Sequence, residues 1–551
     1  MAQRSSFTSR FSAAAVAVAV AGVVFGGAVL VGCVAQLPAN SADAVSNTPP
    51  ITVLLVSGGA GRDYAGKRMG LMADIEGSLK TLDSMMGKGV LSIRNLDLEL
   101  TCGAKEDSCS EQAQLLLENN GADALVYSSG GNSYFNHQRY PSVRPNVFQQ
   151  EITKKWPDFV PLVAGIVEGQ TLAARDAQSL GRLALLEGGL SKLQSRERFE
   201  QDASKDIKGV LMRSLGDIHA ARALLTGAPA EYQQAVNAYD RAVVQGSALP
   251  LQADFLLRSA LAQEAQAAQP FSPALLAEAR TRYARALALR TSAASAQAKV
   301  DDIHFRPVRR EASGRGLSQA VFLEAELGQI RCDTKLAIAQ KDPKRLEALV
   351  VKQQELLTRT RREIDRYVWA NEQSNLCELE LARARAAGAE KSPAELVNRL
   401  FEQAVDACRN AAGAYGKRYQ PALYAQTRAR FADVVAASAE VTGSPRSWEL
   451  AAEEYAEALN VMVPEFYAKE WPELQYKWAR ALIEQGVAER LRATLEKGLE
   501  AVHSAESKVP AGLVLEFQQL EKRAQQALAA EPEELEEPAS SGVPSEVVQP
   551  D

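Results

Sequence analysis

The chain has 551 residues, of which 46% are hydrophobic and 24% are charged. This length is too great for one small core, so we expect several domains or a repeat array. The 62 basic and 68 acidic residues give a formal net charge of −6. Nothing in this balance indicates the basic face that nucleic-acid binding normally requires.

The first predicted element is a secretory signal over residues 1–32. Arg4 and Arg10 precede an almost uncharged apolar stretch from Ala13 to Val31, which is the order typical of such signals. The run Leu-Val-Gly before Cys33 resembles the signal of bacterial lipoproteins, whose cysteine is acylated and becomes the first mature residue. This resemblance implies that Cys33 carries a diacylglycerol and palmitate and anchors the chain in a membrane.

The apolar stretch is also long enough to remain as an uncleaved anchor, although its glycines weaken that alternative. Both interpretations leave the rest of the chain outside the cytoplasm, because the arginines hold the start inside. Val34 stands where an Asp would resemble an inner-membrane retention signal. We therefore expect the periplasmic face of the outer membrane.

A flexible tether over residues 33–50 precedes a predicted small α/β domain over residues 51–150. Its expected elements are a strand at Ile51–Val56, a helix at Tyr64–Met86, a strand at Val90–Leu100, a helix at Ser110–Asn119 and a strand at Ala122–Ser128. The segment Leu115–Tyr127 resembles the helix-turn-strand ending of small α/β domains in bacterial envelope and signalling proteins. That resemblance implies an interaction module.

The loop Gly61–Arg68 nearly matches the phosphate-binding pattern G-x-x-x-x-G-K-[ST], but Arg68 replaces the hydroxyl that would coordinate Mg²⁺. We interpret its glycines as permitting a tight strand-to-helix turn. An anion at this helix N-terminus stays open as an alternative.

The cysteines beyond Cys33 allow two interpretations. Cys102 and Cys109 bracket a polar loop and form a disulfide candidate outside the cytoplasm, the alternative being two unpaired thiols. Cys377 and Cys408 could face each other across a helical hairpin that turns near residues 391–393. Equally, these two and Cys332 could be three buried free thiols.

From Trp156 onward helix-forming residues dominate, and we expect a helical repeat over residues 151–530. A motif of alanine, an aromatic residue and alanine recurs at offsets of four and seven, which places the three side chains on one helix face. The clear copies are Ala235-Tyr239-Ala242, Ala279-Tyr283-Ala286 and Ala451-Tyr455-Ala458, with a looser copy at Val397-Phe401-Ala404. A proline precedes each copy, three times after a serine, as at helix starts.

This motif resembles the second helix of a tetratricopeptide repeat. The resemblance implies an α-solenoid of helix pairs, preceded by the small α/β domain, with proteins or peptides bound on its concave face. The spacing from Tyr239 to Tyr283 is longer than the usual repeat. We therefore expect longer helices or turns, with a final capping helix at Leu513–Ala529. A disordered acidic tail is expected over residues 531–551.

Two groups of side chains are candidates for partner contacts. The tryptophans Trp448, Trp471 and Trp478 could anchor a partner or could fill the core between helices. Arg306, Arg309 and Arg310 lie in an inter-helix loop that could dock an acidic partner or a lipid head group, or could be an ordinary solvated loop.

The sequence contains no catalytic constellation, no histidine cluster with metal-ligand spacing and no cofactor motif. We therefore do not expect an enzyme. The function we expect is a membrane-anchored scaffold that organises the assembly of an envelope complex. The alternative is a regulatory lipoprotein in which the α/β domain senses a small ligand.

Overall fold

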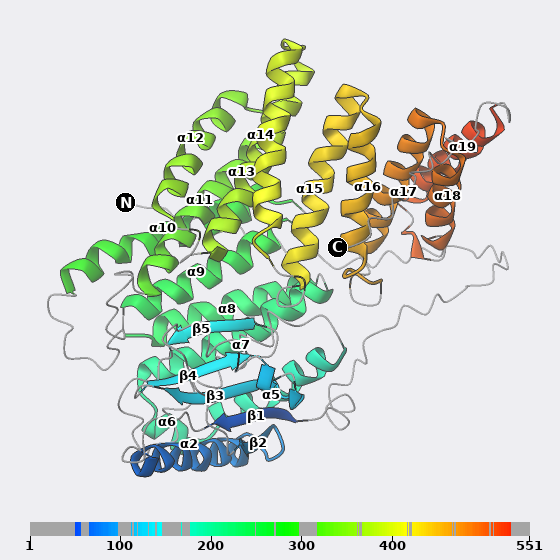
Figure 1. Cartoon of the computed structure of the whole chain (residues 1–551). Coiled ribbons are helices and arrows are strands. Elements are labelled where there is room, and N and C mark those ends of the chain that lie inside the picture. Colours follow the sequence, from blue (N-terminus) through cyan, green and yellow to red (C-terminus); the bar gives the residue numbers. More distant parts are fainter. Residues whose placement is uncertain are drawn as a thin grey trace, which may run out of the picture.

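The computed structural model describes residues 50–56, 65–96, 115–129, 132–145, 177–296 and 317–530, apart from short gaps, and two isolated residues. The fold is mainly α, with a small sheet near the N-terminus (Figure 1). The expected signal, tether, Cys102–Cys109 pair, arginine loop and acidic tail lie outside the described residues.

The sheet has the strand order β2-β1-β3-β4-β5. The strands are β1 (Ile51–Val56), β2 (Leu91–Leu96), β3 (Ala124–Ser129), β4 (Asn132–His137) and β5 (Tyr140–Pro145). β1 pairs in parallel with both β2 and β3, whereas β4 and β5 continue the sheet as antiparallel strands. Strands are thus present at all three predicted places, and residues 97–100 of the second prediction lie outside the described residues.

Both faces of the sheet are covered, as the apolar run of β1 predicts. Ile51, Val53 and Leu55 pack into one cluster with α2 (Ala65–Met86) and α5 (Ala177–Gln194). Leu54 and Val56 point to the opposite face, where they pack with Leu117. The alternation follows from the period of two along a strand.

The turn from α2 to β2 depends on one carboxylate. Asp83 accepts hydrogen bonds from the backbone N–H groups of Gly89, Val90 and Leu91 at 2.8–3.0 Å. Gly87 and Gly89 adopt φ values of 119° and 85°, which other residues rarely reach. The side chain therefore fixes the direction in which the chain enters the sheet.

The helices after the sheet pack in chain order from α7 beside the sheet to α19 at the far end (Figure 1). They are α6 (Glu197–Asp202), α7 (Lys205–Thr226), α8 (Pro229–Gln245), α9 (Leu249–Gln266), α10 (Pro273–Ala296), α11 (Leu317–Gln340), α12 (Pro343–Arg359), α13 (Arg366–Ala389), α14 (Ala394–Ala412), α15 (Pro421–Thr442), α16 (Pro445–Leu459), α17 (Glu470–Glu489), α18 (Arg492–Ala505) and α19 (Val514–Ala529). The last agrees with the helix expected at residues 513–529.

Helices two positions apart also meet. The main contacts of this kind join odd-numbered helices: α5 with α7, α7 with α9, α9 with α11, α11 with α13, α13 with α15, and α17 with α19. From α5 to α15 the odd-numbered helices therefore form a row, and the even-numbered helices of this stretch flank it. This division explains why α9 and α11 have almost no exposed residues while α8 and α12 each show an exposed face.

Helix starts follow the predicted serine and proline signals in part. Ser444 caps α16 by accepting a hydrogen bond from the Ser447 N–H, with Pro445 as the first helical residue. In α14 the prediction is wrong: Pro393 itself is the N-cap, and its extended backbone leaves Ser392 outside the helix. Asp342 caps α12 before Pro343 in the same way as Ser444, although its helix lacks the aromatic motif.

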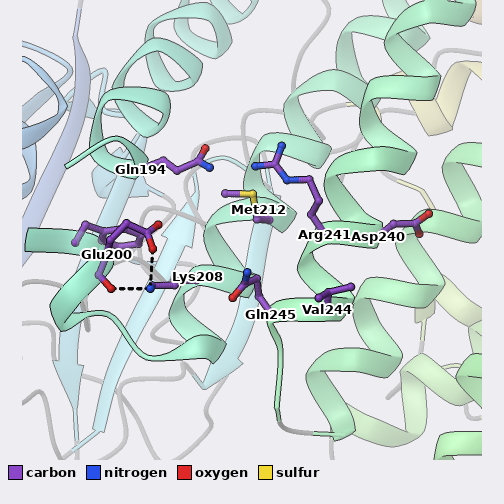
Figure 2. Close-up of a pocket in the computed structure, with 9 residues that line it drawn as sticks. Gln194, Glu200, Lys208, Met212, Asp240, Arg241, Val244 and Gln245 are labelled. Atoms are coloured by element: carbon purple, nitrogen blue, oxygen red, sulfur yellow. Dashed lines mark hydrogen bonds and ion pairs between the residues drawn. The ribbon is translucent and has the colours of Figure 1, made fainter. Parts of the chain in front are cut away.

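Between α5 and α7 the even position is held by α6, which has six residues, whereas α8 has 17. A pocket of about 320 Å³ lies beside α6 (Figure 2). Its lining comes from the end of α5, from α6 and α7, and from the C-terminal half of α8.

Candidate functional site

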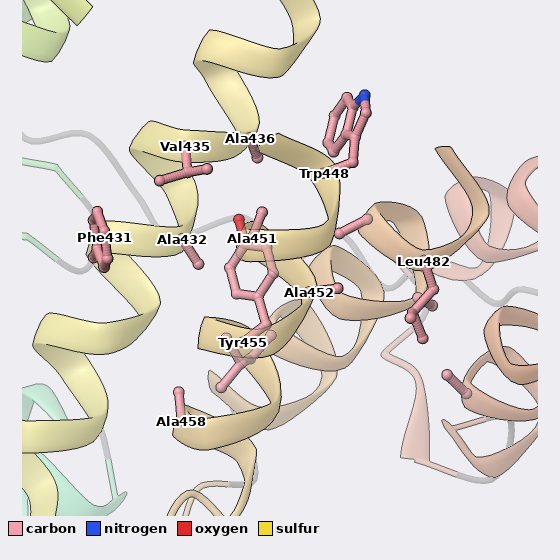
Figure 3. Close-up of a cluster of buried hydrophobic side chains, with 14 of the residues drawn as sticks. Phe431, Ala432, Val435, Ala436, Trp448, Ala451, Ala452, Tyr455, Ala458 and Leu482 are labelled. Atoms are coloured by element: carbon pink, nitrogen blue, oxygen red, sulfur yellow. The ribbon is translucent and has the colours of Figure 1, made fainter. Parts of the chain in front are cut away.

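The repeated alanine and aromatic positions lie in the core of the helical region. In α16, Ala451, Tyr455 and Ala458 face α15, and all three are buried (Figure 3). The equivalent residues of α8, α10 and α14 are buried too: Ala235, Tyr239, Ala242, Ala279, Tyr283, Ala286, Phe401 and Ala404. The offsets of four and seven thus mark the buried face of each of these four even-numbered helices.

Three of the four aromatic residues are tyrosines, and each hydroxyl donates a hydrogen bond to a carboxylate on the preceding odd-numbered helix. Tyr239 donates to Asp217 on α7, and Tyr455 donates to Asp433 on α15, both at 2.7 Å. Tyr283 donates to Glu264 on α9, also at 2.7 Å. A cation from the following odd-numbered helix completes each arrangement, which we call a tyrosine rung.

The cations pair directly with the rung carboxylates. Arg258 on α9 lies 3.1 Å from Asp217, and Lys477 on α17 lies 3.1 Å from Asp433. Glu264 has two partners on α11, because Arg331 lies at 2.8 Å and Lys335 at 2.7 Å. Each rung therefore joins three successive helices: the odd helix that carries the acid, the even helix that carries the tyrosine and the next odd helix.

Burial and charge determine the ionisation of these groups. Burial opposes the ionisation of Glu264, but Arg331 and Lys335 outweigh it and lower the pKa of the carboxyl to about 2. Burial, reinforced by Glu264, raises the pKa of Tyr283 well above its usual range. Burial and the nearby Asp217 carboxylate also raise the pKa of Tyr239 well above its usual range. Because these two tyrosines stay neutral, their hydroxyl groups donate to the carboxylates and hold the helices in register.

Glycines make room for two of the rings. A Cβ atom at Gly216 on α7 would lie 2.6 Å from the ring of Tyr239, and one at Gly328 on α11 would lie 2.4 Å from that of Tyr283. Both distances are shorter than a van der Waals contact, so a side chain at either position would displace the ring. Gly216 is therefore part of the packing of the first clear repeat.

The fourth aromatic residue, Phe401 on α14, has no hydroxyl and cannot form a rung. In that helix pair, Cys377 on α13 and Cys408 on α14 form a disulfide with a Cα–Cα distance of 5.1 Å. Cys332 is free and buried, and burial raises its pKa to about 12. Of the two alternatives that the sequence left open, the structure selects the pairing across the hairpin.

The three candidate tryptophans differ in exposure. Trp448 and Trp471 are only 7% and 8% exposed, and Trp478 is half-buried. A cation lies over each ring: Arg480 is 5.6 Å from the ring centroid of Trp448, Lys508 is 5.3 Å from that of Trp471, and Lys497 is 6.0 Å from that of Trp478. The burial of Trp448 and Trp471 favours core filling over direct contact with a partner.

Sequence reasoning found the tyrosines but missed their partners. A signal was present, because Asp217 precedes Tyr239 by 22 residues and Asp433 precedes Tyr455 by the same number. Glu264 precedes Tyr283 by 19 residues, so the spacing is not constant. The cations on the next helix could be assigned only once the helices were paired in space.

Within the described residues, no His, Cys, Asp and Glu side chains gather into a group that could hold a metal ion. In the same part of the chain, no helix has the length and apolar character needed to cross a membrane. No protein-family model matches the chain, and no curated protein matches its sequence.

Proposed function

We propose that this protein is a lipid-anchored scaffold of the bacterial cell envelope, in which an α-solenoid of tetratricopeptide-like helix pairs binds other envelope proteins. The observation that carries the proposal is the tyrosine rung, which recurs in three helix pairs with the same order of acid, tyrosine and cation. In repeat proteins, successive structural units contact one another through the same recurring interface, and the tyrosine rung is a contact of this kind.

The packing supports the solenoid. Odd-numbered helices meet one another along the row, whereas even-numbered helices flank it. Stacked pairs of this type present a continuous surface built from rows of side chains, which suits the binding of an extended peptide or a protein surface. Rungs that fix the pairs in register would keep that surface in shape without a ligand.

The disulfide supports a location outside the cytoplasm. Bonds such as Cys377–Cys408 persist in oxidising compartments and are rare where thiols are kept reduced. This observation is independent of the signal-like residues around Cys33. Together with Val34 at the following position, these features favour a chain anchored on the periplasmic side of the outer membrane.

Cross-linking in intact cells tests the proposal. The full chain would be cross-linked, purified from membranes and examined by mass spectrometry, with a Cys33→Ala variant as the control for anchoring. We expect an acylated Cys33 and the same envelope proteins in repeated captures, with loss of both in the variant. An intact Met1 on cytosolic protein, or capture of no envelope protein, would contradict the proposal.

A further inference from the structure

The pocket lies beside α6, the six-residue helix between α5 and α7. The C-terminal half of α8 lines it together with residues of α6 and α7. Val244, on that half of α8, is 81% exposed. The pocket volume of about 320 Å³ is at the lower end of the range for small-molecule sites, which suits a compact ligand.

The inner wall of the pocket is apolar. Phe199 on α6 is fully buried and Met212 on α7 is 5% exposed, and both line the pocket. Val244 adds an apolar side chain at the rim (Figure 2). An apolar group that entered here would be removed from water against all three side chains, which favours its binding.

Three of the four charged lining residues already have partners. The Lys208 ammonium lies 2.8 Å from the Glu200 carboxylate and donates to the Glu200 carbonyl oxygen at 2.7 Å. Asp240 pairs with Arg282 on α10 at 2.6 Å and accepts a hydrogen bond from Ser259 at 2.9 Å. These three charges are therefore neutralised within the protein and do not require a charged ligand.

Arg241 is different, because its guanidinium has no acidic partner within the described part of the chain. Figure 2 shows this guanidinium turned toward Gln194 and Met212 at the mouth of the pocket. The amide side chains of Gln194 and Gln245 also line the pocket. The mouth thus offers a fixed positive charge and further N–H donors, directly above an apolar wall.

We propose that this pocket binds a small amphipathic monocarboxylate, whose apolar body lies against Phe199, Met212 and Val244 and whose carboxylate pairs with Arg241. A guanidinium matches a carboxylate with two parallel N–H donors, so it selects this head group over a neutral amide or an amine. Binding here depends only on the residues that line the pocket, so it can exist without the proposed binding of envelope proteins.

Calorimetric titration of the full chain in lipid nanodiscs tests this site, with empty nanodiscs as the reference. The probe is 4-phenylbutyrate, and its neutral analogue 4-phenylbutyramide has the same apolar body without the charge. We expect saturable binding of the carboxylate and at least tenfold weaker binding of the amide. The Arg241→Gln variant should weaken carboxylate binding by a similar factor, because it removes the charge and retains much of the chain length.

Arg285→Gln is the matched control. Arg285 is exposed and lies two residues after Tyr283, as Arg241 lies two residues after Tyr239, but it does not line the pocket. Its replacement should leave binding unchanged. Absence of saturable binding, equal affinity for the amide and the carboxylate, or an equal loss in both variants would each overturn the proposal.

Discussion

At the scale of single residues, the tyrosine rung shows how one hydroxyl group can fix two helices in register. The ring fills the space between helices, and its hydroxyl meets a buried acid that needs a donor. Replacement of Tyr239 or Tyr283 by Phe keeps the packing of the ring. It removes the hydroxyl group that donates a hydrogen bond to the buried carboxylate. Hydrogen bonds to charged groups contribute about 1.5–3 kcal/mol, so we expect a loss of that size in the free energy of unfolding.

Urea denaturation of each Tyr→Phe variant measures this loss. Tyr476→Phe is the control, because Tyr476 packs its ring against Phe517 on α19 and is only half-buried. It should change the unfolding free energy by less than about 0.5 kcal/mol. Equal effects at all three positions would show that the rungs contribute no special stability.

Glu264 makes the fold sensitive to acid. Its pKa is about 2 in the folded protein, against 4.5 for a free carboxyl group. Because the folded-state pKa is the lower one, the ionised carboxylate stabilises the fold above about pH 4.5. The contribution, ~3 kcal/mol, is lost as the pH falls toward 2.

The Glu264→Gln variant tests this dependence, since glutamine keeps the shape and removes the charge. At neutral pH it leaves Arg331 and Lys335 without their anion, so we expect a clear loss of stability. The difference from the natural protein, measured by urea denaturation, should shrink steadily between about pH 5 and pH 2. A difference that stays constant over this range would contradict the assignment.

The rung residues also show which features of the structure could be predicted from the sequence. Tyr239, Tyr283 and Tyr455 are predictable because a period of 3.6 residues dictates which positions face the core. Their acids are charged residues that look like solvated positions in the sequence. Arg241 and the pocket were not predictable, because the pocket is lined by residues of four helices that come together only in the folded chain.

At the scale of helix pairs, the disulfide occupies the place where a rung is missing. A bond between Cys377 and Cys408, 31 residues apart, restricts the unfolded chain and should contribute about 3–4 kcal/mol. We expect that a reductant lowers the thermal midpoint of the natural protein, and that a Cys377→Ala/Cys408→Ala variant starts lower and does not respond. The Cys332→Ala variant should respond as the natural protein does, since Cys332 is free.

The turns between paired helices contain a second element-scale feature. Lys391 follows α13 with φ of 55°, and its neighbour Ser392 donates to the Ala387 carbonyl oxygen at 2.9 Å. The equivalent turn after α15 has Gly443 at φ of 66°. Positive φ strains a lysine but not a glycine, so Lys391→Gly should raise the unfolding free energy by up to about 1 kcal/mol.

Gly443→Lys is the reciprocal experiment and should lower the unfolding free energy by a similar amount in urea denaturation. Both positions are exposed, so packing contributes little to either result. If Lys391→Gly destabilised the protein, the lysine side chain would have to make a contact that offsets the strain. The sequence could not show this feature, because lysine is an unusual residue for a left-handed position.

At the scale of the whole molecule, the sheet and the first helices share one apolar core. Residues of β1, α2, α5 and α7 all belong to it, with Phe255 of α9 at its far end. The sequence predicted the sheet and the helices separately, because local patterns define elements. It could not show that their apolar faces meet, since this contact joins segments more than 100 residues apart.

α2 and α5 approach each other closely at Gly189. A Cβ atom there would lie 3.0 Å from the Met86 side chain, whereas one at the neighbouring Gly188 would meet nothing within 4 Å. We expect Gly189→Leu to lower the unfolding free energy by about 1–3 kcal/mol, because the larger side chain must push α2 away. Gly188→Leu should be neutral or slightly stabilising, since leucine favours a helix more than glycine does.

Hydrogen exchange distinguishes a local effect from a coupled one. If the sheet and the helices unfold together, Gly189→Leu should speed exchange in β1 and β3 as well as in α5, and Gly188→Leu should speed neither. Faster exchange confined to α5 would mean that the sheet holds its structure without the helices. In that case the small α/β unit would be an independent domain attached to the scaffold rather than the first layer of its core.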